Sequence, residues 1–230
     1  TELVISGNKF EGDIDLSQNK SLEKFFAYDN QIGNITFSNS GLTTLSVSNN
    51  QLKSLNVPSS DLYWVEANNN QLMGVNVSAT TNLYLLHLDN NKLNSLNLDG
   101  KNILVSLSIR NNQFESNSLD KLYGQLPDLS DVGVSSENSS WMKWVFVEGN
   151  PGANDADYTI LTNKGWNVDI QGYTSVGKVI SGNPVVAYDP STDDVVFSNL
   201  SVLCARITAL SGISRNVDVQ NGRVSLGELP

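Results

Sequence analysis

The chain has 230 residues, and 24 acidic against 14 basic side chains give it a formal net charge of −10; that length allows one large domain or a medium domain with a small one. An acidic surface repels phosphate backbones, so nucleic-acid binding is disfavoured. The single cysteine, Cys204, excludes an internal disulfide and any zinc site built on several cysteines, and no apolar run approaches the roughly 20 residues that span a bilayer.

An apolar frame that ends in an asparagine recurs through the first part of the chain. Six copies follow one another at intervals of 20 to 22 residues, and the clearest begin at Leu42 and Leu83. The frame fades after Phe114 and returns at Met142, so one turn of the repeat carries an insertion. The recurrent asparagines are Asn8, Asn30, Asn50, Asn70, Asn91, Asn112 and Asn150.

These copies resemble the leucine-rich-repeat family, whose motif is L-x-x-L-x-L-x-x-N-x-L. The resemblance covers about Leu3 to Asp169 and implies a right-handed solenoid with a parallel β-sheet. Each x-L-x-L stretch is a short strand whose apolar side chains turn inward. The asparagine amides can satisfy backbone groups that the turn leaves unpaired, and stacked repeats would form an asparagine ladder. Because each repeat is too short to hold a helix beside its strands, we expect a mostly extended outer side.

Two segments are expected to form short helices. One runs from Ser118 to Tyr123, and the other from Asn154 to Lys164, where Gly165 is its C-terminal stop. The segment from Asn150 to Val168 looks like the closing turn of bacterial surface leucine-rich-repeat proteins. A solenoid needs such a cap because its last repeat would otherwise expose an apolar edge. The repeat domain is therefore predicted to span residues 1–172.

Residues 173–230 have a different composition, with short alternating runs between turns such as Asn221-Gly222. This pattern predicts a small all-β, sandwich-like domain. From Asn183 onward the segment resembles the C-terminal sorting domain of the type IX secretion pathway, which implies export to the surface of a Gram-negative bacterium. The chain departs from that family because it lacks the usual Gly-x-Tyr strand and has Ile213 where a basic residue is common. A generic β-sandwich is the alternative.

The sequence offers no catalytic constellation. His87 is the only histidine, and neither a G-x-S-x-G elbow nor a phosphate-binding glycine loop occurs. We therefore predict a protein that is not an enzyme, with no catalytic residue, no cofactor and no metal ligand. Asp189, Asp193 and Asp194 could offer oxygen ligands to calcium, but without the spacing of an EF-hand loop a solvated turn is the preferred interpretation.

The residues between the inward-facing positions point to the concave face of the solenoid. Large aromatic side chains recur there, and exposed apolar patches usually mark interaction surfaces in which Trp and Tyr contribute strongly. Trp64 and Tyr84 are the expected anchors of one patch that also includes Leu85. The predicted ligand-binding residues are Phe26, Tyr28, Tyr63, Trp64, Glu66, Tyr84, His87, Asp89, Arg110, Trp144 and Phe146.

These observations predict a secreted or surface-displayed binding protein that recognises a protein or a glycan, as in adhesion. One alternative is that this chain is the recognition arm of a larger surface enzyme whose catalytic domain lies outside it. Another is a passive spacer, which predicts no ligand and tolerance of every mutation on the inner face. For the aromatic patch itself, the alternative to a binding site is that the insertion between Asn112 and Met142, or the second domain, folds over it. The resemblance does not identify the ligand, because one fold hosts unrelated partners.

Overall fold

The computed structural model describes residues 1–37, 41–131 and 143–169, and in the C-terminal region the backbone of β13 to β16. The chain divides into two compact units, the first of which holds Thr1–Ala156 and Ile160–Gln171. The two units are described in turn below.

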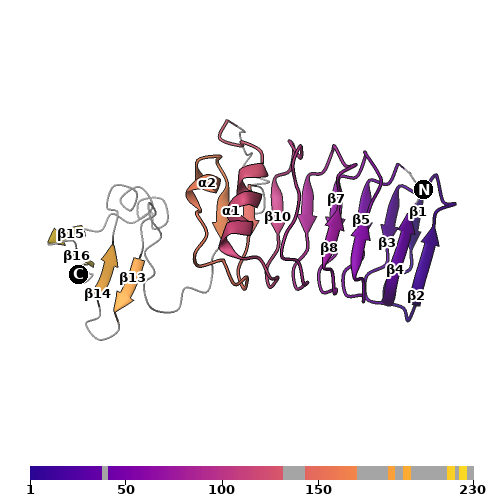
Figure 1. Cartoon of the computed structure of the whole chain (residues 1–230), viewed down its shortest axis with the longest axis horizontal. Coiled ribbons are helices and arrows are strands. Elements are labelled where there is room, and N and C mark those ends of the chain that lie inside the picture. Colours follow the sequence, from indigo (N-terminus) through magenta and orange to yellow (C-terminus); the bar gives the residue numbers. More distant parts are fainter. Residues whose placement is uncertain are drawn as a thin grey trace. The chain divides into compact units, whose positions relative to one another are not determined.

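The first unit is a parallel β-solenoid (Figure 1). Each turn contributes a strand of three residues to one eight-stranded sheet, and the strands follow in chain order. The predicted solenoid of stacked repeats is confirmed. The strands of this sheet are β1 (Glu2–Val4), β3 (Lys24–Phe26), β5 (Thr44–Ser46), β7 (Trp64–Glu66), β9 (Leu85–His87), β10 (Ser106–Ser108), β11 (Trp144–Phe146) and β12 (Asn167–Asp169).

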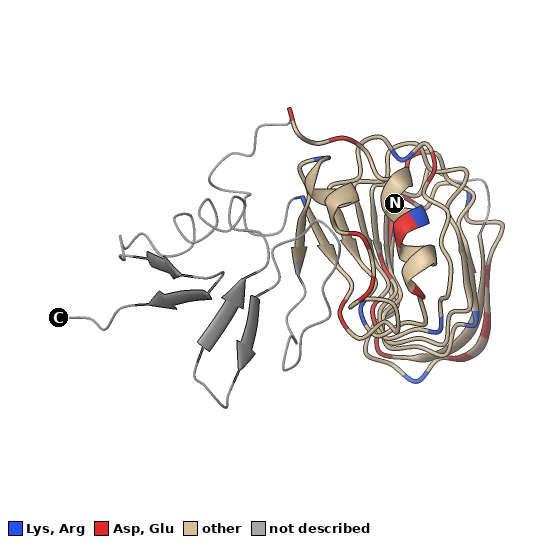
Figure 2. Cartoon of the chain, turned by 60° about the vertical axis from the view of Figure 1, so that its left-hand side comes forward, with Lys and Arg blue, Asp and Glu red and all other residues tan. Residues whose placement is uncertain are grey.

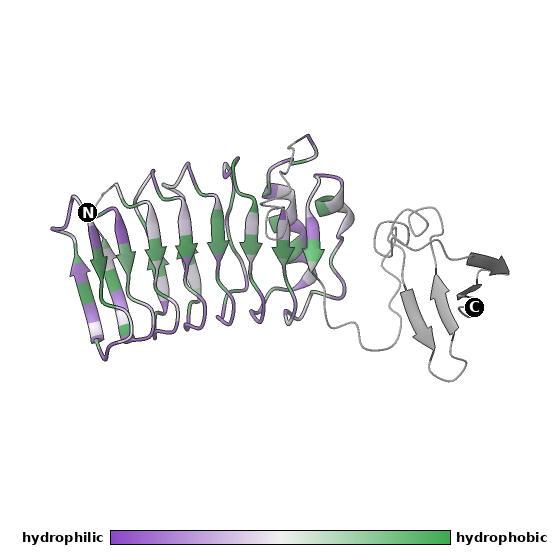
Figure 3. Cartoon of the chain, turned by 180° about the vertical axis from the view of Figure 1, so that it is seen from behind, coloured by the Kyte–Doolittle hydropathy of each residue, from purple (hydrophilic) through white to green (hydrophobic). Residues whose placement is uncertain are grey.

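The central residue of each strand points into the core and pairs with the central residue of the next strand. Phe25 pairs with Leu45, which pairs with Val65, and all three side chains are fully buried. Figure 3 shows these apolar positions as a hydrophobic stripe across the sheet. Each repeat buries its apolar edge against its neighbours, and removing apolar surface from water stabilises a stack by about 25 cal/mol per Å².

The outer side of the solenoid is extended over part of its length. There β2 (Glu11–Leu16) pairs in parallel with β4 (Gln31–Phe37), and the register shifts once, between Gly12 and Asp13. Further along, β6 (Ser54–Asn56) pairs in parallel with β8 (Gly74–Asn76). The described outer segments after β8 form turns and bends without strand pairing until α1.

The recurrent asparagines tie each turn to the one before it. The Asn50 side-chain nitrogen donates to the carbonyls of Val47 at 3.1 Å and Ser48 at 3.2 Å in its own turn, and to Ala27 at 2.9 Å in the preceding turn. Its side-chain oxygen accepts a hydrogen bond from the Ile32 backbone N–H at 3.0 Å. The asparagine ladder therefore consists of hydrogen bonds between side-chain amides and backbone groups. The same pattern of own-turn and preceding-turn bonds recurs at Asn30, Asn70, Asn91, Asn112 and Asn150.

Asn8 differs from the other recurrent asparagines. It lies in the first turn and is exposed, and its side-chain nitrogen donates only to Ile5 and Ser6 within that turn. The cross-repeat half of the pattern is therefore missing at Asn8.

The residue immediately before each ladder asparagine adopts a left-handed backbone conformation, with φ between 51° and 58° in five turns. Asn and Asp tolerate that region better than most residues because their short polar side chains can hydrogen-bond locally. Their side chains form a second, exposed row: Asn111 donates to Asn90 at 2.8 Å, and Asn90 donates to Asn69 at 2.7 Å. The five residues are Asp29, Asn49, Asn69, Asn90 and Asn111.

The C-terminal end of the solenoid is closed by α1 (Ser116–Gln125) and the segment that returns to β12. The Lys164 ammonium donates to the carbonyls of Tyr123 at 3.2 Å, Gly124 at 2.7 Å and Leu126 at 2.7 Å. These groups lie at the C-terminal end of α1, where helix carbonyls lack partners and a cation is favoured. Trp166 adds a bond from its indole nitrogen to the Pro127 carbonyl at 2.8 Å.

The predicted helix from Asn154 to Lys164 is wrong in extent, because α2 covers only Thr159–Thr162. Before α2 the chain makes tight turns, in which Asp155 and Ala156 both donate to the Gly152 carbonyl. The helical turn starts where Asp157 accepts bonds from the backbone and hydroxyl of Thr159, as a capping residue does.

Within the second unit the described strands form an antiparallel sheet in the order β13-β14-β16-β15. The strands are β13 (Val186–Asp189), β14 (Asp194–Phe197), β15 (Val217–Gln220) and β16 (Arg223–Leu226). The domain boundary at residue 172, the sandwich, the sorting-domain resemblance and the calcium alternative remain predictions, because most of the residues that carry them lie outside the described part of the chain.

Candidate functional site

The side of the eight-stranded sheet that points away from the core is called here the strand face. Parallel pairing in register places equivalent positions of successive repeats beside one another. Trp64 thus lies beside Leu85, and Ser106 lies between Leu85 and Trp144. A neighbouring row runs through Glu66, His87, Ser108 and Phe146.

Tyr63 and Tyr84 form a stacked pair on the strand face. Their ring centroids are 4.7 Å apart and their planes differ by 9°. Tyr63 is 42% exposed although it is a large aromatic residue. Partial burial, the neighbouring Tyr84 and a hydrogen bond with Tyr84 raise the pKa of Tyr63 above its ordinary value of 10.0. The pair offers an exposed aromatic surface with hydroxyl groups beside it.

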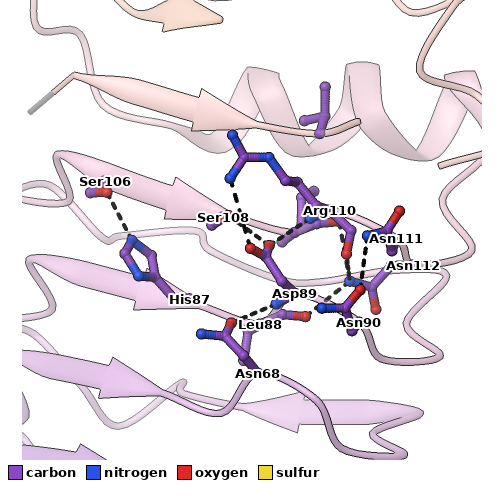
Figure 4. A network of polar contacts seen from close by, with 12 residues as sticks. Asn68, His87, Leu88, Asp89, Asn90, Ser106, Ser108, Arg110, Asn111 and Asn112 are labelled. Atoms are coloured by element: carbon purple, nitrogen blue, oxygen red, sulfur yellow. Dashed lines mark hydrogen bonds and ion pairs between the residues drawn. The ribbon is translucent and has the colours of Figure 1, made fainter. Parts of the chain in front are cut away.

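Asp89 is the centre of a polar network at the opposite end of β9 from Tyr84 (Figure 4). Its Oδ1 accepts hydrogen bonds from the Ser108 hydroxyl at 2.6 Å and from the Arg110 backbone N–H at 2.7 Å. The Asp89 backbone N–H donates to the Asn68 side-chain oxygen at 2.8 Å. These bonds join three consecutive repeats, and they hold the carboxylate in one orientation.

A second aromatic cluster lies beside this network. The rings of Trp144 and Phe146 stack with centroids 5.8 Å apart and planes 15° apart. The Arg110 guanidinium lies 4.2 Å from the Phe146 ring centroid, within cation–π range, and 4.0 Å from the Asp89 carboxylate. Arg110 therefore links the cluster to the polar network.

Part of the strand face is covered. Leu85 is only 2% exposed and Ser106 is fully buried, so the prediction that Leu85 belongs to an exposed patch is wrong. Leu85 lies in the row between Trp64 and Ser106, where a large indole flanks the shorter aliphatic side chain. In the tyrosine pair, Tyr63 is exposed and Tyr84 is partly exposed.

His87 meets a hydroxyl group that sequence reasoning did not identify. Its Nε2 lies 3.1 Å from the Ser106 Oγ, a distance suited to a nucleophile and a base. Ser106, however, has no exposed surface to offer a substrate. Asp89 is bonded to Ser108 and Arg110. Burial, the largest influence, lowers the pKa of His87 below its ordinary value of 6.5, so the ring is neutral at pH 7.

The predicted site residues fall into three groups. Phe26 and Tyr28 lie on the β3 repeat, Tyr63 to Glu66 and Tyr84 lie around β7 and β9, and the rest surround the Asp89 network. His87, Asp89, Arg110, Trp144 and Phe146 form that third group. Sequence reasoning missed Asn68 and Ser108, although their positions in the repeat place both on the strand face.

Figure 2 shows Asp and Glu positions (red) along the turns of the solenoid, with Lys and Arg positions (blue) between them. Within the described residues, no three His, Cys, Asp or Glu side chains are grouped to hold a metal ion. No helix of that part of the chain is long and apolar enough to cross a membrane.

No protein-family model and no curated protein matches the chain. Among solved structures, it is similar to the functional domain of InlJ from Listeria monocytogenes, which includes a cysteine ladder. The TM-score is 0.44 and the sequence identity is 19%. The alignment covers 71% of this chain and 42% of that one, so this chain matches less than half of the InlJ domain.

Proposed function

We propose that this chain is a non-enzymatic binding module whose strand face recognises a protein or a glycan. The observation that carries the proposal is the stacked Tyr63–Tyr84 pair, which is partly exposed on a sheet whose core does not need it. Exposed aromatic surface costs free energy in water, and on a soluble protein it usually marks a contact site. Tyr and Trp also contribute much of the energy at binding interfaces.

The polar network beside the aromatic rings supports recognition rather than nonspecific adhesion of apolar surface. Asp89 and Asn68 are partly exposed and are already oriented by bonds across three repeats, with the buried Ser108 holding the Asp89 carboxylate, so a ligand would meet groups with little freedom to lose. Binding sites of this kind gain affinity from side chains that are fixed before the ligand arrives.

A non-catalytic role fits the environment of the one histidine. A Ser–His pair catalyses acyl transfer only when a substrate reaches the hydroxyl, and Ser106 has no surface. The His87–Ser106 bond is therefore assigned a positioning role within the sheet face.

We further propose that the module works outside the cell, on the surface of a Gram-negative bacterium. The support is the resemblance of residues 178–230 to a type IX sorting domain. Secretion of the full-length protein by that pathway, and its loss when those residues are deleted, would test this part separately from binding.

The binding proposal is tested by screening the purified chain against a glycan array and a panel of purified surface proteins. The Trp64→Ala/Tyr84→Ala double variant is screened beside it, and Phe10→Ala/Met73→Ala serves as control because Phe10 and Met73 are exposed and lie outside the strand face. A ligand retained by the control and lost by the double variant would support the proposal. A ligand retained by both variants would place the site elsewhere, and no ligand at all would favour a spacer.

A further inference from the structure

Tyr63 and Tyr84 occupy the same position in consecutive repeats, immediately before β7 and β9. The register of these strands places the two residues side by side, because Trp64 pairs with Leu85 and the Tyr84 backbone N–H donates to the Tyr63 carbonyl at 2.9 Å. The rings, 4.7 Å apart at their centroids, therefore stack along the direction in which the repeats follow one another.

The hydroxyl ends of the two rings meet. A hydrogen bond joins the side chains of Tyr63 and Tyr84, and the phenol hydroxyl is the only polar group of either side chain. Since the ring planes differ by only 9°, the carbons next to each hydroxyl also face one another across the stack. In a tyrosyl radical these ortho carbons carry much of the unpaired electron, in p orbitals perpendicular to the ring. Two such radicals, stacked in this way, are placed to form a carbon–carbon bond.

An oxidant in solution has access to this pair. Tyr63 is 42% exposed and Tyr84 is partly exposed, whereas Tyr123 and Tyr158 are buried. An electron can therefore be removed from Tyr63 directly, and Tyr84 can be oxidised either directly or through the stacked ring. The pair combines access to solvent with a second phenol in contact.

Tyr28 has the same exposure as Tyr63 but different neighbours. The strand register places Tyr28 level with Ser6 in the preceding repeat and with Ser48 in the following one. Neither neighbour is a tyrosine, so an oxidised Tyr28 has no phenol beside it on the adjacent strands. Tyr28 therefore separates the effect of exposure from the effect of pairing.

We propose that Tyr63 and Tyr84 form a site of oxidative cross-linking, at which hydrogen peroxide acting through a peroxidase converts the pair into dityrosine. Each phenol gives up one electron and its hydroxyl proton, and together they reduce one peroxide molecule to two molecules of water. The two radicals join through one ortho carbon each. The hydrogen atoms on these carbons then move as protons to the oxygens, which restores both hydroxyl groups. The net reaction removes two hydrogen atoms and forms one bond.

The cross-link joins two consecutive repeats through the strand face. A covalent bond between distant residues removes conformational freedom from the unfolded chain, so the cross-linked solenoid should unfold at a higher temperature than the untreated one. The inference does not rest on the proposed function, because the reaction needs no protein or glycan ligand.

The test treats a dilute solution of the chain with a haem peroxidase and hydrogen peroxide. Low protein concentration favours coupling within one chain over coupling between chains, and size-exclusion chromatography then isolates the monomer. Dityrosine fluorescence measures the cross-link, and mass spectrometry of a proteolytic digest identifies the joined peptides. Tyr63→Phe and Tyr84→Phe each keep a ring in the stack but remove one phenol, and Tyr28→Phe is the control of matched exposure. Circular dichroism establishes that each variant is folded.

We expect dityrosine in the monomer of the parent chain and of Tyr28→Phe, carried by joined Tyr63 and Tyr84 peptides that together lack two hydrogen atoms. The fluorescence should be lost in Tyr63→Phe and in Tyr84→Phe. A parent monomer without dityrosine, or a Tyr63→Phe monomer that keeps it, would overturn the proposal. So would a cross-linked monomer that melts no higher than the untreated chain, because the bond would then have formed from separated repeats rather than from the stacked pair.

Discussion

At the scale of single residues, the buried asparagines do the most to fix the repeat. Asn70 shows why, since its nitrogen donates to the carbonyls of Val47 and Ala67 and its oxygen accepts from the Leu52 N–H. All three backbone groups are buried, and an unmade hydrogen bond inside a protein costs more than a made one contributes. One side chain thus satisfies groups in two successive turns.

Replacing Asn70 with alanine should lower the free energy of unfolding by about 3 kcal/mol, because several buried backbone groups would lose their partner. Urea denaturation followed by circular dichroism measures the change. Asn69→Gly is the matched control at the adjacent position: its φ of 54° suits glycine, and the side chain it loses is exposed. The control should change the stability by less than about 1 kcal/mol. Equal losses in both variants would contradict the role given to the ladder.

The histidine provides a prediction about pH. Burial lowers the pKa of His87 most, Arg110 adds to this, and Asp89 and Glu66 oppose it. The unfolded chain takes up a proton near pH 6.5, before the folded chain does, so stability falls as the pH drops through that value and levels off below the folded pKa.

His87→Gln removes this contribution, and the chain contains no other histidine. Between about pH 7.5 and about pH 5.5, the stability of the variant should therefore fall less than that of the parent chain. Denaturation curves at several pH values measure the difference. Identical pH profiles would show that burial does not affect the titration of His87.

Much of this residue-level detail follows from sequence. The spacing of Asn50 and Asn70 predicts their place at a turn, because a backbone turn needs side-chain acceptors and donors at one position in every repeat. The sequence also favours a left-handed residue before each ladder asparagine, because asparagines such as Asn49 and Asn69 tolerate positive φ. The meeting of His87 with Ser106 was not predicted, because it depends on which of several side chains in a row turn toward one another.

At the scale of elements, the closing segment depends on contacts between distant parts of the chain. Lys164→Met should destabilise the solenoid by about 2 kcal/mol, because three carbonyls at the end of α1 would lose a charged donor. Lys121→Met, an exposed lysine on the same helix, is the control and should change stability by less than about 0.5 kcal/mol. Thermal denaturation of both variants measures the two changes in stability. Similar losses of stability in Lys164→Met and Lys121→Met would refute the capping role of Lys164.

At Gly152 the returning segment packs tightly against the start of α1. A Cβ atom at this position would lie 1.9 Å from the Ser116 backbone nitrogen and 2.2 Å from the Glu115 carbonyl carbon. Because backbone atoms cannot move aside, Gly152→Ala should cost about 3 kcal/mol or prevent closure of the cap.

The helical Gly124 offers the opposite case, since its Cβ would meet nothing within 4 Å. Gly124→Ala should stabilise α1 by about 0.5 to 1 kcal/mol. Chemical denaturation of the two glycine variants compares them directly. A Gly152→Ala protein as stable as the parent would show that the two segments do not pack as described.

The elements themselves were predictable in different degrees. The period-2 apolar pattern around Leu45 identifies a strand because only one face is buried. The helix near Ser118 was predicted within a few residues. The extent of α2 was not, because the segment from Gly152 to Ala156 is held in tight turns by its packing against the start of α1, which local sequence does not show.

At the scale of the whole molecule, a solenoid separates stability from recognition. The core and the ladders hold the repeats together, while the strand face is free to carry residues that packing does not require. Tyr63, just before β7, and Thr44, on β5, are examples, because the central residue of each of these strands is buried. Sequence predicted which positions form this face, but it could not show which of them neighbouring side chains cover, as at Leu85.

The most direct measurement compares stability and binding for the double variant Tyr63→Ala/Tyr84→Ala, using whichever ligand the screen identifies. The stacked pair contributes about 0.5 to 1.5 kcal/mol to folding, so the variant should unfold at nearly the same urea concentration as the parent. Its affinity for the ligand should fall by a factor of about thirty or more. A variant that keeps its affinity, or loses it only because the solenoid has unfolded, would contradict the claim that the strand face is the binding site.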